Sequence, residues 1–152
     1  MRKRLALAAA TVLVSGAGAA AWIAVSSSRA PAATTFTVID HPVHLGITGN
    51  GGKSQGDIFW FYNPVYDATN STKVGSDQGA CIRMNPKKGT WQCSATTFLE
   101  DGQLVVEGRL HDTKDSTFAV TGGTGSYSAA SGTMDVHCYA DDDRCELVFT
   151  LT

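Results

Sequence analysis

Short strand-like segments recur at nearly even spacing through residues 33–152, and this pattern limits the fold more than any other feature of the sequence. Gly, Asp, Asn and Pro separate the segments, and no ten-residue stretch has the periodicity of an amphipathic helix. The predicted strands lie near residues 34–40, 57–67, 73–84, 90–99, 103–111, 116–121, 132–140 and 144–151. Eight strands with short connections predict an all-β domain, either a sandwich or an eight-stranded antiparallel closed barrel.

The segment Ile58-Phe59-Trp60-Phe61-Tyr62 does not alternate between apolar and polar residues. A strand that is apolar on both faces needs cover on both faces. An eight-stranded barrel is wide enough to enclose either packed side chains or one small ligand. The segment therefore predicts an apolar interior on one side and a second layer or subunit on the other.

The first 32 residues have the pattern of an export signal. Arg2, Lys3 and Arg4 precede the uncharged run 5–25, and the small-residue patch 30–32 offers a cleavage site. The run is also long enough to cross a bilayer, so an uncleaved signal anchor is the alternative. The predicted division is therefore a signal peptide or signal anchor at 1–32 and a β domain at 33–152. This domain would be secreted, or anchored on the outer face of the cell membrane.

The charge of the predicted domain excludes one class of partner. Of the 12 basic residues four lie in the first 32 positions, whereas all 14 acidic residues lie beyond them, which leaves 8 basic against 14 acidic residues and a net charge of −6. Nucleic-acid binding needs a basic surface, so it is not expected here.

Four cysteines form an even set in a domain predicted to be exported, where disulfides persist. Cys81 and Cys93 flank the turn signal 85–89, and Cys138 and Cys145 flank the acidic run 141–143. We therefore predict two hairpin disulfides, Cys81–Cys93 and Cys138–Cys145. Neither pair has the spacing of a zinc ribbon, so no metal site is predicted.

The most specific stretch is Gly122-Gly123-Thr124-Gly125-Ser126-Tyr127, continued to Gly132. No helix is predicted after it, so it does not fit a phosphate-binding loop, and a glycine-rich corner between two strands is the simpler interpretation. The stretch resembles the G-G-T-G-x-[FY]-x-x-A-x-G signature of the dirigent and allene oxide cyclase-like barrels. The resemblance continues through 36–152, including Val38-Ile39-Asp40-His41-Pro42, Gly56-Asp57-Ile58, Gly79-Ala80-Cys81 and Asp101-Gly102-Gln103-Leu104.

This resemblance implies an eight-stranded antiparallel barrel, often trimeric, with an apolar cavity and no cofactor. Enzymes of this group close a ring in an allene oxide fatty acid or direct the coupling of phenoxy radicals. Asn63 matches a cyclase asparagine that helps hold a water near the epoxide oxygen, and Cys81 matches a cyclase cavity cysteine. Thr113 and Ser131 replace a cyclase tyrosine and a dirigent arginine, so neither plant-type substrate is implied.

Asp40 and Asn63 are the predicted catalytic residues. In an apolar cavity the pKa of Asp40 would rise toward a range useful for proton transfer. The alternative is a solvated aspartate that caps the turn at Pro42. Asn63, if it points inward, could donate to a developing oxyanion; otherwise it is a turn residue before Pro64.

The predicted ligand-binding residues are Phe59, Phe61, Arg83 and Tyr127. Arg83 shares a face with Cys81, so it either projects into the cavity, where it could hold a carboxylate or carbonyl, or stacks outside on Trp91. A tyrosine such as Tyr127 could donate to a ligand, although buried tyrosines usually only pack.

Two functions remain open from the sequence. The first is a secreted, cofactor-free isomerase or cyclase that binds a hydrophobic small molecule and guides its cyclisation or stereoselective coupling. The second is a non-catalytic extracellular carrier of an apolar ligand. A barrel whose cavity is filled by its own aromatic side chains, and which acts through its surface, is a third alternative.

Overall fold

The computed structural model describes residues 33–139 and 142–152; the predicted export segment, residues 1–32, lies outside this range. The described part is almost entirely β. Its strands are β1 Thr34–Asp40, β2 Leu45–Thr48, β3 Ile58–Asp67, β4 Lys73–Asn85, β5 Thr90–Leu99, β6 Gly102–His111, β7 Ser116–Gly125, β8 Gly132–Tyr139 and β9 Arg144–Leu151. The one helix within this range is the 3-10 turn η1, Pro86–Lys88, so no helix there has the length to cross a membrane.

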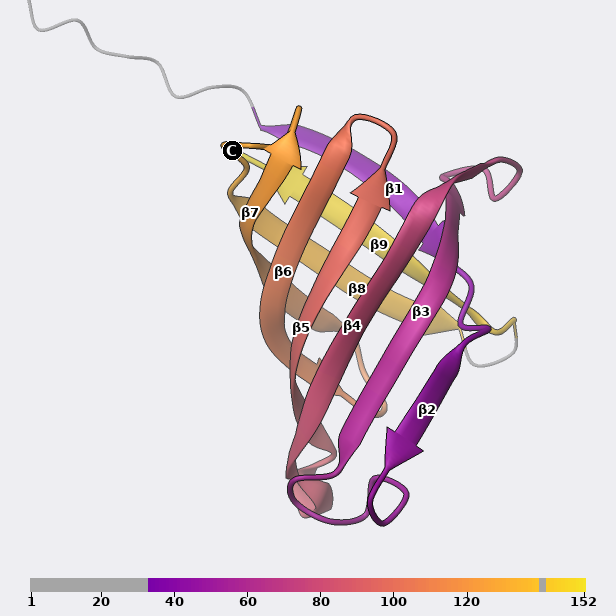
Figure 1. Cartoon of the computed structure of the whole chain (residues 1–152), viewed down its shortest axis with the longest axis vertical. Helices are drawn as coiled ribbons and strands as arrows, with labels where there is room; N and C mark the ends of the chain where they lie inside the picture. The colour runs from indigo at the N-terminus through magenta and orange to yellow at the C-terminus, as the bar shows by residue number, and fades with distance from the viewer. Residues whose placement is uncertain (1–32, 140–141) are drawn as a thin grey trace, which may run out of the picture.

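Eight of the strands close into an antiparallel barrel, as predicted (Figure 1). β3 to β9 pair in chain order, and β1 closes the sheet by pairing with β9 along its whole length and with the end of β3. Closure leaves these eight strands without a long free edge, which is the usual way in which an all-β chain satisfies its backbone groups.

One strand, β2, was absent from the sequence prediction. β1 ends at Asp40, two residues before Pro42, and β2 then takes over the pairing with β3 through Leu45 opposite Phe61 and Thr48 opposite Ile58. In Figure 1, β2 continues the sheet beyond the end of β1. A segment of four residues that contains a glycine is too short to show the alternation of a strand in the sequence. It becomes a strand because it pairs with the exposed edge of β3.

The glycine-rich stretch is also different from the predicted corner. β7 continues through Gly122–Gly125, and the reversal to β8 comes at residues 126–131. The register between β6 and β7 shifts between Val105 and Val106. Gly122 has φ +158 and Gly125 has φ +61, so the bulged strand uses backbone angles that glycine accepts readily.

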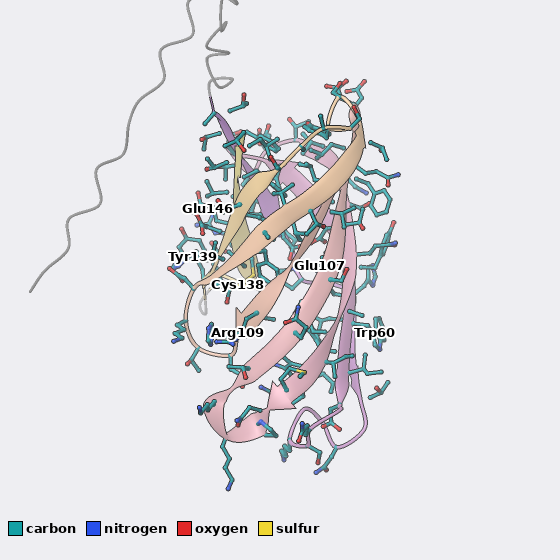
Figure 2. The ribbon with its side chains drawn as sticks, turned by 90° about the vertical axis from the view of Figure 1, so that its left-hand side faces the viewer. Trp60, Glu107, Arg109, Cys138, Tyr139 and Glu146 are labelled. Atoms are coloured by element: carbon teal, nitrogen blue, oxygen red, sulfur yellow. A yellow bond between two sulfur atoms is a disulfide. The ribbon has the colours of Figure 1, made fainter. Side chains whose placement is uncertain are left out.

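Both predicted disulfides are confirmed, Cys81–Cys93 between β4 and β5 and Cys138–Cys145 between β8 and β9. In each pair the two residues lie directly opposite each other on neighbouring strands. Cys81 and Cys93 are buried in the barrel wall, whereas Cys138 is exposed at the end of β8 (Figure 2).

Alternation along β3 divides its aromatic residues between two faces. Phe59 and Phe61 point inward and join the core, whereas Tyr62 and Trp60, which Figure 2 labels, remain about half exposed on the outside. Ile58 on β3 and its partner Ile82 on β4 extend this outer apolar face. The inner cover predicted for this strand is therefore present, and the outer face is uncovered in the single chain.

Candidate functional site

The barrel encloses a cavity of about 870 Å³, mostly apolar. Phe59, Phe61, Val106, Phe118 and Met134 line it together with the disulfide Cys81–Cys93. Leu45 and Ile47 of β2 line it as well, yet they are 48% and 45% exposed, so they lie where the cavity meets solvent. A cavity of this size is typical of sites for drug-sized molecules.

Two carboxyl groups lie together in the wall of this apolar cavity. Asp40, the last residue of β1, is 6% exposed, and Asp77 in the middle of β4 is 5% exposed. The two side chains lie close enough that the charge of Asp40 acts on Asp77. Oδ1 of each residue has no hydrogen-bond partner among the described residues. We refer to Asp40 and Asp77 as the carboxyl pair.

Burial raises the pKa values of both groups, and the charge of Asp40 separates them. Loss of solvation raises the pKa of Asp40 to about 6, although hydrogen bonds from Asp77 and Asn63 oppose the shift. Loss of solvation also raises the pKa of Asp77, and the neighbouring charge of Asp40 raises it further, to about 8. At neutral pH the pair therefore holds one proton, with Asp40 as the better base and Asp77 as the acid.

Asn63 positions Asp40 within this site. It is buried on β3, where it lies opposite Asp77 in the register with β4. Its amide nitrogen donates to Asp40 Oδ2 at 3.3 Å, and its Oδ1 accepts from the backbone N–H groups of Val43 and His44 at 3.1 and 3.2 Å. The amide therefore connects the carboxyl pair to the segment between β1 and β2, which favours a positioning role over the predicted role as an oxyanion donor.

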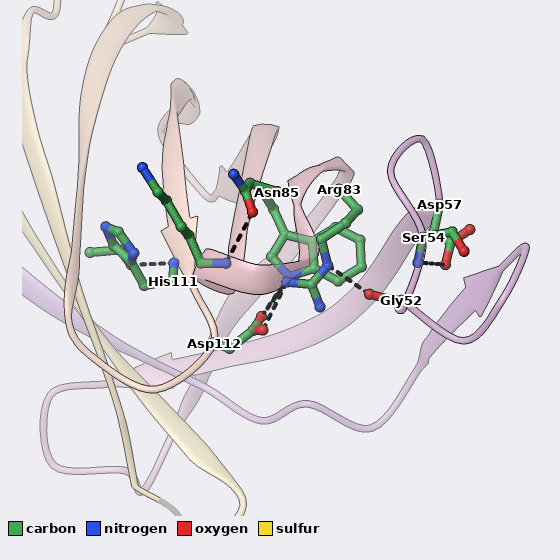
Figure 3. A network of polar contacts seen from close by, with 10 residues as sticks. Gly52, Ser54, Asp57, Arg83, Asn85, His111 and Asp112 are labelled. Carbon is green, nitrogen blue, oxygen red and sulfur yellow. Dashed lines mark hydrogen bonds and ion pairs between the residues drawn. The ribbon is translucent and has the colours of Figure 1, made fainter.

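Arg83 lies at another part of the cavity, in a set of polar contacts with Trp91, Asp112 and Gly52 (Figure 3). Its Nη1 donates to both carboxylate oxygens of Asp112 at 2.8 and 2.9 Å, and its Nε donates to Gly52 O at 2.8 Å. Its guanidinium carbon lies 3.8 Å from the centroid of the Trp91 ring. Arg83 thus projects inward, as the first alternative predicted, and it stacks on Trp91 inside the barrel rather than outside it.

The charge of Arg83 is balanced within this cluster. Trp91 Nε1 donates to Asp112 at 2.7 Å. Although burial opposes the change, the hydrogen bonds from Arg83 and Trp91 lower the pKa of Asp112 and keep it ionised. The ion pair therefore leaves little net charge for a ligand at this place.

The structure brings most predicted site residues to the cavity, but not all of them. Asp40, Asn63, Phe59, Phe61 and Arg83 line it. Tyr127 does not; it packs at 6.2 Å from Phe36 in the core instead. Residues 33–139 and 142–152 contain no cluster of three metal-ligating side chains.

Asp77 is the residue that the sequence reasoning missed. The alternation that places Arg83 and Cys81 on one face of β4 also places Asp77 there, since these positions differ by even numbers. That signal was available. The sequence gives no signal for the pairing of Asp77 with Asp40, because this pairing depends on how β1 closes against β3 next to β4.

Comparison with known proteins agrees with this architecture. The sequence model of the family described as dirigent-like protein matches residues 20–151. The chain therefore belongs to the dirigent-like protein family. No curated protein matches the sequence.

Solved structures of several functions share the fold. A pyocyanin demethylase is 29% identical, with a TM-score of 0.68 over 78% of this chain and 100% of that one. An exo-specific intermolecular Diels-Alderase is 18% identical, with a TM-score of 0.65 over 78% and 97%. A pterocarpan synthase dirigent protein is 17% identical, with a TM-score of 0.64 over 78% and 85%. The two more distant relatives establish the fold alone.

Proposed function

We propose that this protein is a secreted, cofactor-free barrel that binds an apolar small molecule and guides its cyclisation or stereoselective coupling by proton transfer. The observation that carries the proposal is the carboxyl pair, Asp40 and Asp77, which is buried in an apolar cavity and holds one proton at neutral pH. Two like groups whose pKa values are pushed apart supply one acid and one base at the same pH.

The proton balance of such a reaction closes within the site. The carboxylate of Asp40 takes a proton from a C–H or O–H group of the substrate, and the protonated Asp77 returns one to another atom of it. The two carboxyl groups lie close together, and the higher pKa of Asp77 favours return of the proton from Asp40 to Asp77. An isomerisation or ring closure needs no other reactant, and the cavity contributes by holding the reactive conformer away from water.

A chemical probe tests the base directly. 5-Nitrobenzisoxazole is a small aromatic molecule that opens to a coloured cyano-nitrophenolate when a base removes its ring C–H proton. We expect the wild-type protein to accelerate this opening about 100-fold relative to Asp40→Asn, the order of magnitude of general-base catalysis. The rate should rise with pH through about 6, the pKa of Asp40.

The proposed acid–base role fails if Asp40→Asn opens the probe as fast as the wild type does. Glu107→Gln is the matched control, because Glu107 is exposed on β6 and does not line the cavity. Product analysis with an unstable allene oxide and with a polyene precursor then tests cyclisation itself. A product ratio and rate equal to the uncatalysed reaction would reject these two substrate types.

Pyocyanin is a further substrate to test, because a pyocyanin demethylase is 29% identical to this chain. Trp91 lines the cavity, so ligand entry should quench its fluorescence. Quenching by pyocyanin without conversion would support binding alone.

The alternative function is an extracellular carrier of an apolar ligand. It is favoured by the disulfide Cys81–Cys93, which leaves no thiol in the cavity wall, and by the absence of the tyrosine and arginine at positions 113 and 131. Native mass spectrometry of gently isolated protein distinguishes the two functions. An intact, unmodified ligand that remains bound in both wild type and Asp40→Asn supports carriage.

We also propose that a second copy of the chain covers the outer face of β3 and β4. Trp60 is 46% exposed and Ile82 is 49% exposed, which is unusual for neighbouring apolar side chains on a monomer. The family resemblance, which implies trimers, agrees with this proposal. Anchoring through residues 1–32 remains the alternative to full secretion.

A further inference from the structure

The charge of the carboxyl pair leads to a narrower statement about the ligand, which rests on the proposed function. Asp40 and Asp77 together carry one negative charge when they hold one proton. A charge buried in an apolar cavity is costly unless an opposite charge compensates it. The opposite charge must come either from the protein or from the ligand.

Two basic side chains that could offset the charge of the pair contact other groups instead. His41 follows Asp40 in the chain, but its Nε2 is 2.6 Å from Asn70 Oδ1, and its ring packs at 4.8 Å from Tyr66. Arg83 is bound to Asp112 through both carboxylate oxygens. Arg83 therefore does not neutralise the pair, and the charge of His41 has only the smallest of the effects on the pKa of Asp40.

The remaining charges that line the cavity belong to its outer part. Lys114 and Asp115 lie together in the turn between β6 and β7 and offset each other, and Asp115 also holds His137 Nδ1 at 2.6 Å. The elements packed against the pair contribute neutral groups only: Asn63 from β3, Thr97 from β5 and the disulfide-bonded Cys145 from β9.

The pair also offers hydrogen-bond acceptors that the protein does not use. Oδ1 of Asp40 and Oδ1 of Asp77 are buried without a hydrogen-bond partner among the described residues. Phe59 and Phe61, with ring centroids 5.7 Å apart, are aromatic surfaces in the same cavity. Aromatic faces attract cations, and buried carboxylates attract them more strongly.

We propose that the cavity selects a flat, apolar molecule that carries one positive charge, such as a cationic nitrogen heteroaromatic, and that the carboxyl pair compensates this charge. The rings of the ligand would contact the aromatic and aliphatic wall. A neutral molecule of the same shape would bind less tightly, and an anion least tightly.

Three probes of one ring system test this selection: N-methylacridinium as the cation, acridine as the neutral molecule at pH 7, and acridine-9-carboxylate as the anion. Their fluorescence reports binding. We expect the cation to bind about 10- to 100-fold more tightly than acridine, as expected for opposite charges a few ångströms apart in a partly solvated site. Equal affinity for cation and neutral probe, or no binding of the cation, overturns the inference.

The double variant Asp40→Asn/Asp77→Asn removes the charge and keeps the side-chain size. It should bind acridine within about twofold of the wild type and lose the preference for the cation. A preference that persists in this variant overturns the inference, because another group would then produce it. Thermal unfolding of the variant confirms that it is folded.

A second measurement needs no variant. As the pH rises from 5 to 8 the pair loses protons, since its pKa values are about 6 and about 8. The cation should therefore bind more tightly at pH 8 than at pH 5. Equal affinity at both pH values contradicts the proposal.

These results remain separable from the test of catalysis. A cation preference without opening of 5-nitrobenzisoxazole supports the ligand class and rejects the acid–base role. Opening of 5-nitrobenzisoxazole without a cation preference supports the acid–base role and rejects the ligand class.

Discussion

Replacing Asp77 with asparagine should stabilise the barrel at neutral pH. In the unfolded chain this carboxyl has its ordinary pKa of 3.8, whereas in the folded protein burial and the charge of Asp40 raise the pKa to about 8. The native state therefore binds more protons than the unfolded state between about pH 4 and pH 8. Stability falls as the pH rises through this range, because folding takes up a proton and free protons become scarcer.

The size of the effect follows from the shift. At pH 7 the native protein holds a proton about 3 pH units above the ordinary pKa, and each unit corresponds to about 1.4 kcal/mol. The full cost is thus about 4 kcal/mol, and relaxation around the coupled pair reduces what is measured to about 2–4 kcal/mol. Asparagine avoids this cost, since it needs no proton and its amide can donate to Asp40.

Urea unfolding of the wild type and Asp77→Asn at pH 4 and pH 7 measures this difference. We expect Asp77→Asn to unfold at a higher midpoint at pH 7, with a free energy of unfolding about 2–4 kcal/mol larger, and to differ little at pH 4. Glu107→Gln, an exposed carboxyl on β6, is the control and should change neither value by more than about 0.5 kcal/mol. Equal stability of Asp77→Asn and wild type at pH 7 would show that the pair does not titrate as the structure implies.

Two further predictions concern the disulfides and the outer face. A small reductant should open Cys138–Cys145 before Cys81–Cys93, because Cys138 is exposed whereas Cys81 is 1% exposed. Alkylation followed by mass spectrometry gives the order in which the two disulfides open, and early labelling of Cys81 would contradict the prediction. In light scattering, Trp60→Glu should convert a multimer to a monomer, while Thr121→Glu, on the exposed face of β7, should leave the mass unchanged. A wild-type protein that is already a monomer would reject the proposed contact between copies through the outer face of β3 and β4.

The candidate site shows where sequence reasoning stops. Side-chain direction in a strand has a period of two, so the sequence shows that Phe59 and Phe61 share one face of their strand, but it left open whether Arg83 points inward; the structure places all three at the cavity. The same rule puts Asp77 on the inner face of β4. It does not show that Asp77 meets Asp40, because these residues are 37 positions apart and approach each other only when the barrel closes.

Tyr127 illustrates the opposite case. Its hydroxyl could have donated to a ligand, yet it packs against Phe36 of β1 in the core. The difference arises because β7 continues to Gly125 and moves the turn, with Tyr127, past the end of the strand. A local pattern could not indicate how far β7 would extend, since its partner β6 determines that length.

The amino-acid sequence by itself determined the all-β class, the positions of eight strands to within a few residues, and both disulfides, because each of these depends on neighbours along one strand or one hairpin. Only the tertiary structure decided that β1 closes the sheet, that β2 extends β3, and that Asp40 and Asp77 share a proton in a cavity of about 870 Å³. The physical reason is solvation: a carboxyl group acquires an unusual pKa only when distant parts of the chain together exclude water from it.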